Sequence, residues 1–102
     1  MSFYEMRQLS VDGPAMAYRL DSVIRHELRR LQELRQTRDE QKTIANGFLD
    51  GLKPYELMAR NPIAYGQYSY HHDRHWEAMH DIIWLRHSLK QLFGVRRAGR
   101  TG

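Results

Sequence analysis

A run of apolar residues at helical spacing limits the fold of this chain more than any other feature. From Pro14 onward these side chains recur at steps of three, four and seven: Met16, Leu20, Val23, Ile24, Leu28, Leu31 and Leu34. Such steps place one continuous stripe along a helix. Asp12 and Pro14 supply an entry signal, because Asp caps unpaired amides and Pro fits the first helical turn. The sequence therefore predicts one long helix that begins near Pro14.

The sequence does not decide where this helix ends. Between Arg35 and Thr43 the apolar spacing lapses, and no Gly or Pro forces a turn. Either one helix continues through a solvated stretch, or Thr37 caps a new helix with Glu40 as its capping-box partner. A new helix would form a hairpin with the first and fold four apolar side chains back on the first stripe: Ile44, Phe48, Leu49 and Leu52.

Pro and Gly residues punctuate the second half of the chain. Any helix that reaches this part is weakened or ended at one of three pairs: Asn46-Gly47, Asp50-Gly51 and Lys53-Pro54. A short helix is expected over residues 54–60, and Asn61-Pro62 ends it. Residues 63–70, with one Gly and three Tyr, indicate an ordered loop. A last helix is expected from about residue 71 to 93, with Gly94 as its stop.

These elements predict an all-α fold, a small bundle of three to four helices. At 102 residues the chain is long enough for one modest core, so we expect a single helical domain over 1–94. Residues 95–102, rich in Gly and Arg, indicate a flexible basic C-terminal tail. The pattern does not decide whether the first eleven residues form a helix or an extended segment.

The last helix is amphipathic to doubly apolar. At 100° per residue, one narrow arc holds the expected core: Ala78, Ile82, Leu85, Leu89 and Leu92. A second arc on the opposite side also lacks charge: Trp76, His80, Ile83, Trp84 and His87. Two interpretations remain open. Either the chain itself covers both sides of this helix, or the second face is exposed for docking.

The histidines raise the question of a metal site. Four lie within ten residues, beside carboxylates at spacings of three and four: His71, His72, His75 and His80. However, the His-Glu-x-x-His pattern of zinc proteases is absent, and so is a second Glu-x-x-His for a di-iron site. We therefore predict no metal and no cofactor, and expect histidines that hydrogen-bond tyrosines and carboxylates and make binding sensitive to pH.

Several classes of protein are excluded or disfavoured. Without cysteine, the chain has no disulfides and no thiolate sites. No serine lies in a nucleophile elbow and no Gly-rich loop fits a phosphate, so we expect no enzyme. No apolar run approaches the roughly 20 residues that cross a bilayer, and we expect a cytoplasmic protein without a membrane partner.

Charge follows position along the chain. The formal charge is +4, from 16 Lys and Arg against 12 Asp and Glu. Residues 1–85 are close to neutral, whereas residues 86–102 hold five basic side chains and no acid. This basic end favours contact with phosphates or with an acidic protein, and such contact weakens with salt.

Together these features predict a small non-enzymatic protein-binding module that docks on a partner protein and modulates or inhibits it. We expect a host or cognate partner from a nucleic-acid-processing complex, in the style of phage or plasmid accessory proteins. Tyr, Trp and Arg dominate interface hot spots. The predicted contact residues are Tyr65, Tyr68, Tyr70, His72, Trp76, Trp84, Arg96 and Arg97.

Two alternatives stay open. The first is direct binding of nucleic acid, with tyrosines stacked on bases and phosphates contacted by Arg25, Arg29, Arg86, Lys90 and Arg100. The second is a metal-binding helical protein that uses the His and carboxylate cluster. A homodimer is compatible with the sequence, whether the chain binds a protein or nucleic acid.

Overall fold

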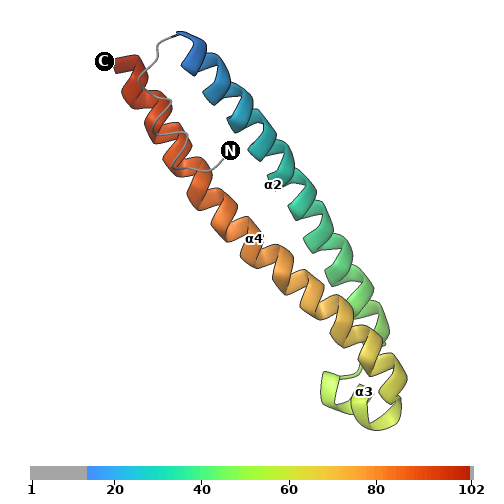
Figure 1. The fold of residues 1–102 in the computed structure, drawn as a ribbon. Helices are drawn as coiled ribbons and strands as arrows, with labels where there is room; N and C mark the ends of the chain where they lie inside the picture. Colours follow the sequence, from blue (N-terminus) through green and yellow to red (C-terminus); the bar gives the residue numbers. More distant parts are fainter. Residues whose placement is uncertain (1–13, 102) are drawn as a thin grey trace. The chain divides into compact units, whose positions relative to one another are not determined.

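The computed structural model describes the backbone of residues 14–101 and the side chains of residues 18–99. This part contains three α-helices and no strand, so the all-α prediction is confirmed: α2 (Pro14–Leu49), α3 (Pro54–Arg60) and α4 (Pro62–Thr101) (Figure 1). None of these helices is long and apolar enough to cross a membrane. The open question about the first eleven residues lies outside the described part.

Helix α2 resolves the alternative between one helix and two. It is continuous from Pro14 to Leu49, so residues 35–43 are a solvated stretch of a single helix. Of the predicted breaks, Asn46-Gly47 does not end the helix. Asp50-Gly51 does, because both residues adopt left-handed backbone conformations, with φ of 47° and 78°. The Leu52 amide then donates to the Leu49 carbonyl at 2.8 Å and closes the turn.

Helix α3 has the predicted bounds, with Pro54 in its first turn. The Glu56 carboxylate accepts a hydrogen bond from the backbone amide of Lys53 at 3.4 Å. Asn61 follows and serves the next helix, since its side-chain oxygen accepts from the Ala64 amide at 3.1 Å. Asn61-Pro62 therefore ends one helix and begins another within two residues.

Two predicted boundaries of the last helix are wrong. Residues 63–70 are helical rather than a loop, because Pro62 pre-sets the first turn and Asn61 caps it. Gly66 lies in open space on this helix and does not break it. Gly94 is not a stop either, and α4 continues to Thr101. The division into a domain of residues 1–94 and a flexible tail stays a prediction.

The chain forms two compact units, each described here by itself. Unit 1 contains Met1–Gln32 and Ile83–Gly102, and unit 2 contains Glu33–Ile82. In unit 1 the two helices bury one apolar stripe each: Leu20, Ile24 and Leu31 of α2, and Leu85, Leu89 and Leu92 of α4. The predicted stripe of the first helix is thus only partly core, since Leu28 is exposed.

Unit 2 has its own core around the short helix. Ala45, Leu57 and Tyr68 are buried together, one from each helix. Five partly buried side chains pack against them: Phe48, Leu49, Leu52, Ala64 and Tyr65. Of the four side chains proposed to fold back, Ile44 is exposed and the other three pack here. Ala78 and Ile82 are also buried, so all five residues of the predicted core arc of the last helix are confirmed.

Candidate protein-docking surface

Three of the predicted contact residues form a hydrogen-bonded ladder along α4 in unit 2. The Trp76 indole N–H donates to Nε2 of His72 at 3.1 Å, and Nδ1 of His72 lies 3.4 Å from the Tyr68 hydroxyl. An indole nitrogen only donates, so Nε2 must accept and the proton of neutral His72 resides on Nδ1. The ring of His72 also stacks on Tyr68, with centroids 5.3 Å apart. Each member therefore orients the next.

This ladder is anchored at one end and exposed at the other. Tyr68 is only 9% exposed and belongs to the core of unit 2, whereas Trp76 is 49% exposed. Tyr65 also packs against the core, with its ring 6.1 Å from that of Tyr68. Two of the predicted contact tyrosines are thus structural, and only the distal end of the ladder is open to a partner.

Tyr70 lies on the exposed part of α4, where Arg74 holds it. The Arg74 guanidinium donates to the Tyr70 hydroxyl at 3.0 Å and sits over its ring, 5.7 Å from the centroid. The hydrogen bond to Tyr70 raises the pKa of Arg74 above its ordinary value. Tyr70 and Arg74 therefore present one joined polar and aromatic surface.

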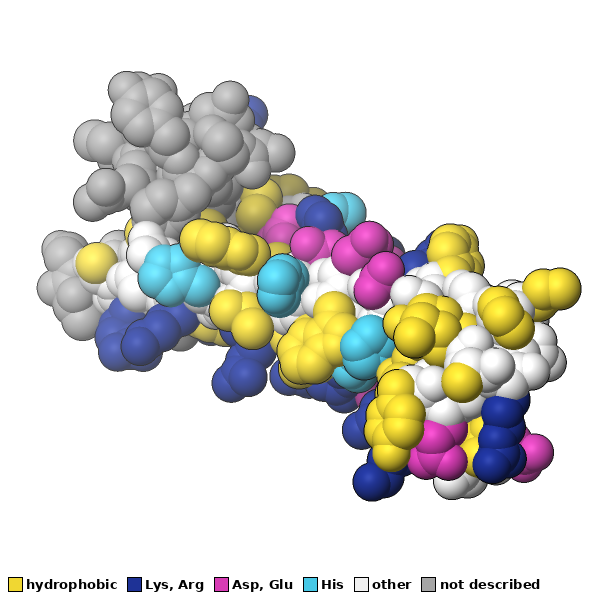
Figure 2. Space-filling model, turned by 90° about the horizontal axis from the view of Figure 1, so that it is seen from below, with side chains coloured by type: hydrophobic (Ala, Val, Ile, Leu, Met, Phe, Trp, Pro, Cys, Tyr) yellow, Lys and Arg dark blue, Asp and Glu magenta, His cyan; other side chains and the backbone are white. Residues whose placement is uncertain are grey.

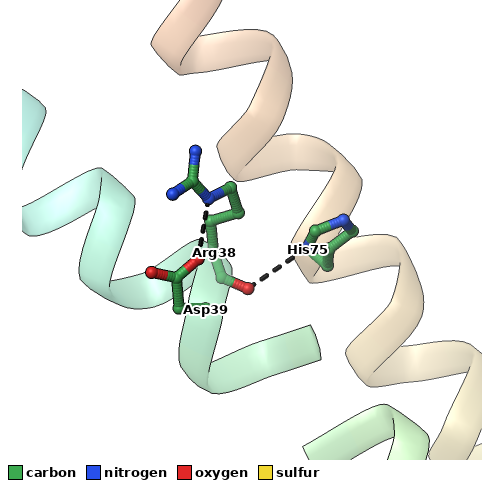
Figure 3. A network of polar contacts seen from close by, with 3 residues as sticks. All are labelled: Arg38, Asp39 and His75. Atoms are coloured by element: carbon green, nitrogen blue, oxygen red, sulfur yellow. Dashed lines mark hydrogen bonds and ion pairs between the residues drawn. The ribbon is translucent and has the colours of Figure 1, made fainter. Parts of the chain in front are cut away.

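Two neighbouring histidines join α4 to α2 inside unit 2, a role that sequence analysis missed. His71 Nδ1 lies 2.6 Å from Oε1 of Gln41, and His75 Nδ1 lies 3.1 Å from the backbone carbonyl of Arg38 (Figure 3). Both oxygens only accept, so both rings donate through Nδ1. The partners lie 30 and 37 residues away in sequence, and no local pattern indicates such pairs.

An exposed carboxylate lies beside this junction. Asp39 accepts a hydrogen bond from Nε of Arg38 at 2.9 Å (Figure 3). That hydrogen bond lowers the pKa of Asp39 below its ordinary value, and the positive charges of Arg38, Lys42 and His75 act in the same direction.

In unit 1 the outer side of α4 carries an apolar pair. Trp84 is 71% exposed and Ile83 is 60% exposed, although Ile82 and Leu85, which flank the pair in sequence, are buried. Nearby, the Gln91 amide donates to Nε2 of His87 at 3.0 Å. The described residues of unit 1 leave the side chains of Trp84 and Ile83 largely exposed, and the interpretation in which the N-terminal segment covers this face lies outside the described part. Figure 2 shows hydrophobic and histidine side chains interspersed on one face, with Lys and Arg beside them.

The two predicted contact arginines differ in their surroundings. Arg96 is half-buried, donates to Asp21 of α2 at 3.3 Å, and lies over the ring of Phe93 at 4.9 Å. It therefore holds the two helices of unit 1 together. Arg97, the next residue, is exposed.

The fold concentrates positive charge in unit 1. By sequence, unit 1 holds ten Lys and Arg against four Asp and Glu, whereas unit 2 holds six against eight. The net charges are thus +6 and −2. The residues of the nucleic-acid alternative all belong to unit 1: Arg25, Arg29, Arg86, Lys90 and Arg100, the last with its side chain outside the described part.

Among the described side chains, no three His, Asp or Glu residues converge in a way that would hold a metal ion. Three histidines of the sequence cluster, His71, His72 and His75, bond instead to a tyrosine, a glutamine, a tryptophan and a backbone carbonyl. The metal-binding alternative therefore gains no support from this part of the chain.

Comparison with known proteins gives no relative from which a function could be carried over. No family model matches the chain, and neither a curated protein nor a solved structure is similar to it.

Proposed function

We propose that this protein is a non-enzymatic protein-binding module that docks on a partner protein and modulates it. We further propose that the partner acts on nucleic acid and that binding takes place in the cytoplasm. The observation that carries the proposal is the exposure of Trp84 beside Ile83 on α4.

Exposed tryptophan next to an exposed β-branched residue is unusual on a helix that already has a buried stripe. Within the described residues, Trp84 makes no hydrogen bond or ring contact that would hold it. Covering such a side chain contributes on the order of 2 kcal/mol or more at an interface hot spot. A partner helix on this face would also complete the small bundle that the sequence predicts, because a helix pair buries only one stripe of each member.

Photocrosslinking tests this proposal in cells of the native host. Benzoylphenylalanine in place of Trp84 should give a covalent adduct with one protein after nuclease treatment of the lysate. The matched control carries the same group in place of Ser22, an exposed polar position of α2 in the same unit. Failure to form an adduct at position 84, or the same adducts at both positions, would contradict the proposal.

A second candidate function, direct binding of nucleic acid, is favoured by the charge of unit 1. Phosphate contacts need Lys and Arg side chains that no acid has paired, and among the described residues of unit 1 Arg29, Arg86 and Lys90 form no ion pair. The tyrosines that were expected to stack on bases lie in unit 2 instead. The charge therefore supports this candidate, and the placement of the aromatic residues does not.

Fluorescence anisotropy with a labelled 20-nucleotide strand and a 20-bp duplex tests the second candidate. Binding should weaken with salt, and R86E/K90E should make the log–log salt slope shallower by about two, one unit per lost phosphate contact. The control R35E/K42E reverses two exposed basic residues of unit 2 and should leave the slope unchanged. Equal slopes for both double variants would contradict binding through unit 1.

A further inference from the structure

The outer face of α4 in unit 1 combines an apolar patch with a basic edge. Leu85, Leu89 and Leu92 define the buried side of the helix, and Ile83 and Trp84 lie away from it. Arg86 and Lys90 are both exposed and one helical turn apart. At 100° per residue they form a row next to Ile83, so an occupant of the apolar patch also meets this row.

The charge around this face is one-sided. No acidic residue occurs in residues 83–102, and by sequence unit 1 holds four acidic residues against ten basic ones. Of these four, Asp21 is already paired with Arg96. An occupant that brings carboxylates would therefore find basic side chains without competing acids in residues 83–102.

From these observations we propose that the occupant is an acidic amphipathic helix of a partner protein, with its apolar stripe on Ile83 and Trp84 and its carboxylates facing Arg86 and Lys90. This inference rests on the proposed function and names the chemistry of the partner. A helix suits the face because helices pack by fitting rows of side chains into grooves, and Arg86 and Lys90 form such a row beside Ile83. Docked helices of this kind bind through anchors at spacings of three, four and seven.

Other occupants fit the face less well. A second copy that packed unit 1 on unit 1 would bring two surfaces of net charge +6 together, and like charges oppose such contact. Nucleic acid would pair with Arg86 and Lys90, but phosphate contacts give no role to Ile83 beside Trp84. Charge and apolar exposure are both satisfied by an acidic helix.

The experiment selects the partner chemistry without knowledge of the partner. A displayed library of random 20-residue peptides is panned against the full-length chain, and winning peptides are synthesised for titration. The winners should carry net negative charge and apolar residues at spacings of three, four and seven. Each should bind W84A at least about ten-fold more weakly than the parent chain.

Charge reversal supplies the second arm. R86E/K90E should weaken the same peptides about ten-fold, and should bind more tightly a peptide whose Glu residues are replaced by Lys. The controls Y55A and R35E/K42E change an exposed aromatic and two exposed cations of unit 2, and should bind as the parent does. Circular dichroism on every variant confirms that helix content is retained.

Five results would overturn the inference. Winning peptides without negative charge would contradict the stated chemistry, and equal binding by W84A and the parent would contradict the stated site. A 20-bp duplex that displaces the peptides from the parent chain, and whose own binding W84A leaves unchanged, would assign the face to nucleic acid. A dimer of the isolated chain that W84A dissolves would assign it to a second copy. An adduct at position 84 with a segment that is not acidic would leave the proposed function standing and remove this inference alone.

Discussion

The two units use aromatic side chains in opposite ways. In unit 2 several aromatic and histidine residues of α4 bond to one another and to α2, as in the ladder from Tyr68 to Trp76 and the junction between His71 and Gln41. In unit 1 Trp84 and Ile83 are exposed, and the charge is strongly positive. The comparison teaches that density of aromatic residues in sequence is a poor guide to a binding surface. Exposure without an internal partner is the better one.

The largest expected effect concerns the core of unit 1. Leu89→Ala removes a side chain that is 4% exposed and leaves a cavity, so it should lower the free energy of unfolding by about 2–5 kcal/mol. Urea denaturation at 25 °C measures this value. Ile83→Ala, on the outer face of the same helix, should change it by less than about 0.5 kcal/mol. Similar losses for both variants would break the distinction between a buried and an exposed side of α4.

Hydrogen exchange on Leu89→Ala sharpens the comparison of the two units. If each unit opens on its own, protection should fall first for amides of residues 14–32 and 83–101 and later for those of residues 33–82. Uniform loss over both sets would mean that the units unfold as one body.

Glycine substitutions in unit 2 should act in opposite directions. Gly51 has a φ of 78°, so Gly51→Ala should destabilise by about 1 kcal/mol. Gly66 is helical with open space for a Cβ, and Gly66→Ala should stabilise by about 0.4–1 kcal/mol. Thermal melts followed by circular dichroism measure both. A loss of stability in Gly66→Ala would contradict the helix over residues 63–70.

The ladder of unit 2 should respond to His72→Phe, which keeps a flat ring and removes both hydrogen bonds. We expect a loss of about 0.5–1.5 kcal/mol in unfolding free energy. In a Trp84→Phe background Trp76 is the sole tryptophan, and its emission should change as the indole N–H loses its acceptor. His72→Phe with unchanged emission would show that the ladder does not orient Trp76.

The smallest effect is expected at Asp39. Its folded-state pKa is lowered, so its contribution is present above the ordinary value of 3.8 and is lost as pH falls through the lowered value. Asp39→Asn should therefore lower stability slightly at neutral pH and match the parent chain at pH values below the lowered pKa, which flattens the acid limb of the stability curve. Melting temperatures from pH 3 to 7 test this, with Asp73→Asn, an exposed acid on α4, as the control.

Periodicity predicted much of the fold because burial repeats along a helix. The core arc from Ala78 to Leu92 and the short helix over residues 54–60 needed no long-range information. The missed start of α4 has a local cause, because Asn61-Pro62 both ends one helix and begins the next. The helical state of residues 95–101 was missed because Gly94 is tolerated on an exposed side.

The candidate site was harder to predict because it depends on which segments pair. When the charged residues are counted along the sequence, the arginines of α2 fall within residues 1–85, whose net charge is close to zero. Pairing of residues 14–32 with residues 83–101 instead joins Arg25 and Arg29 to the unit that holds Arg86 and Lys90. Likewise, the link between His71 and Gln41 exists only in three dimensions.

The continuation of α4 beyond Gly94 makes the last basic residues directional. On a helix, Arg96 and Arg97 point about 100° apart, so Arg96 forms an ion pair with Asp21 while Arg97 points in another direction. A single residue inserted between Gly94 and Arg96 would rotate the Arg96 side chain away from Asp21 and put another side chain in its place. The helical backbone of residues 95–101 thus fixes the direction of each basic side chain, which an unfolded segment of the same sequence would not do.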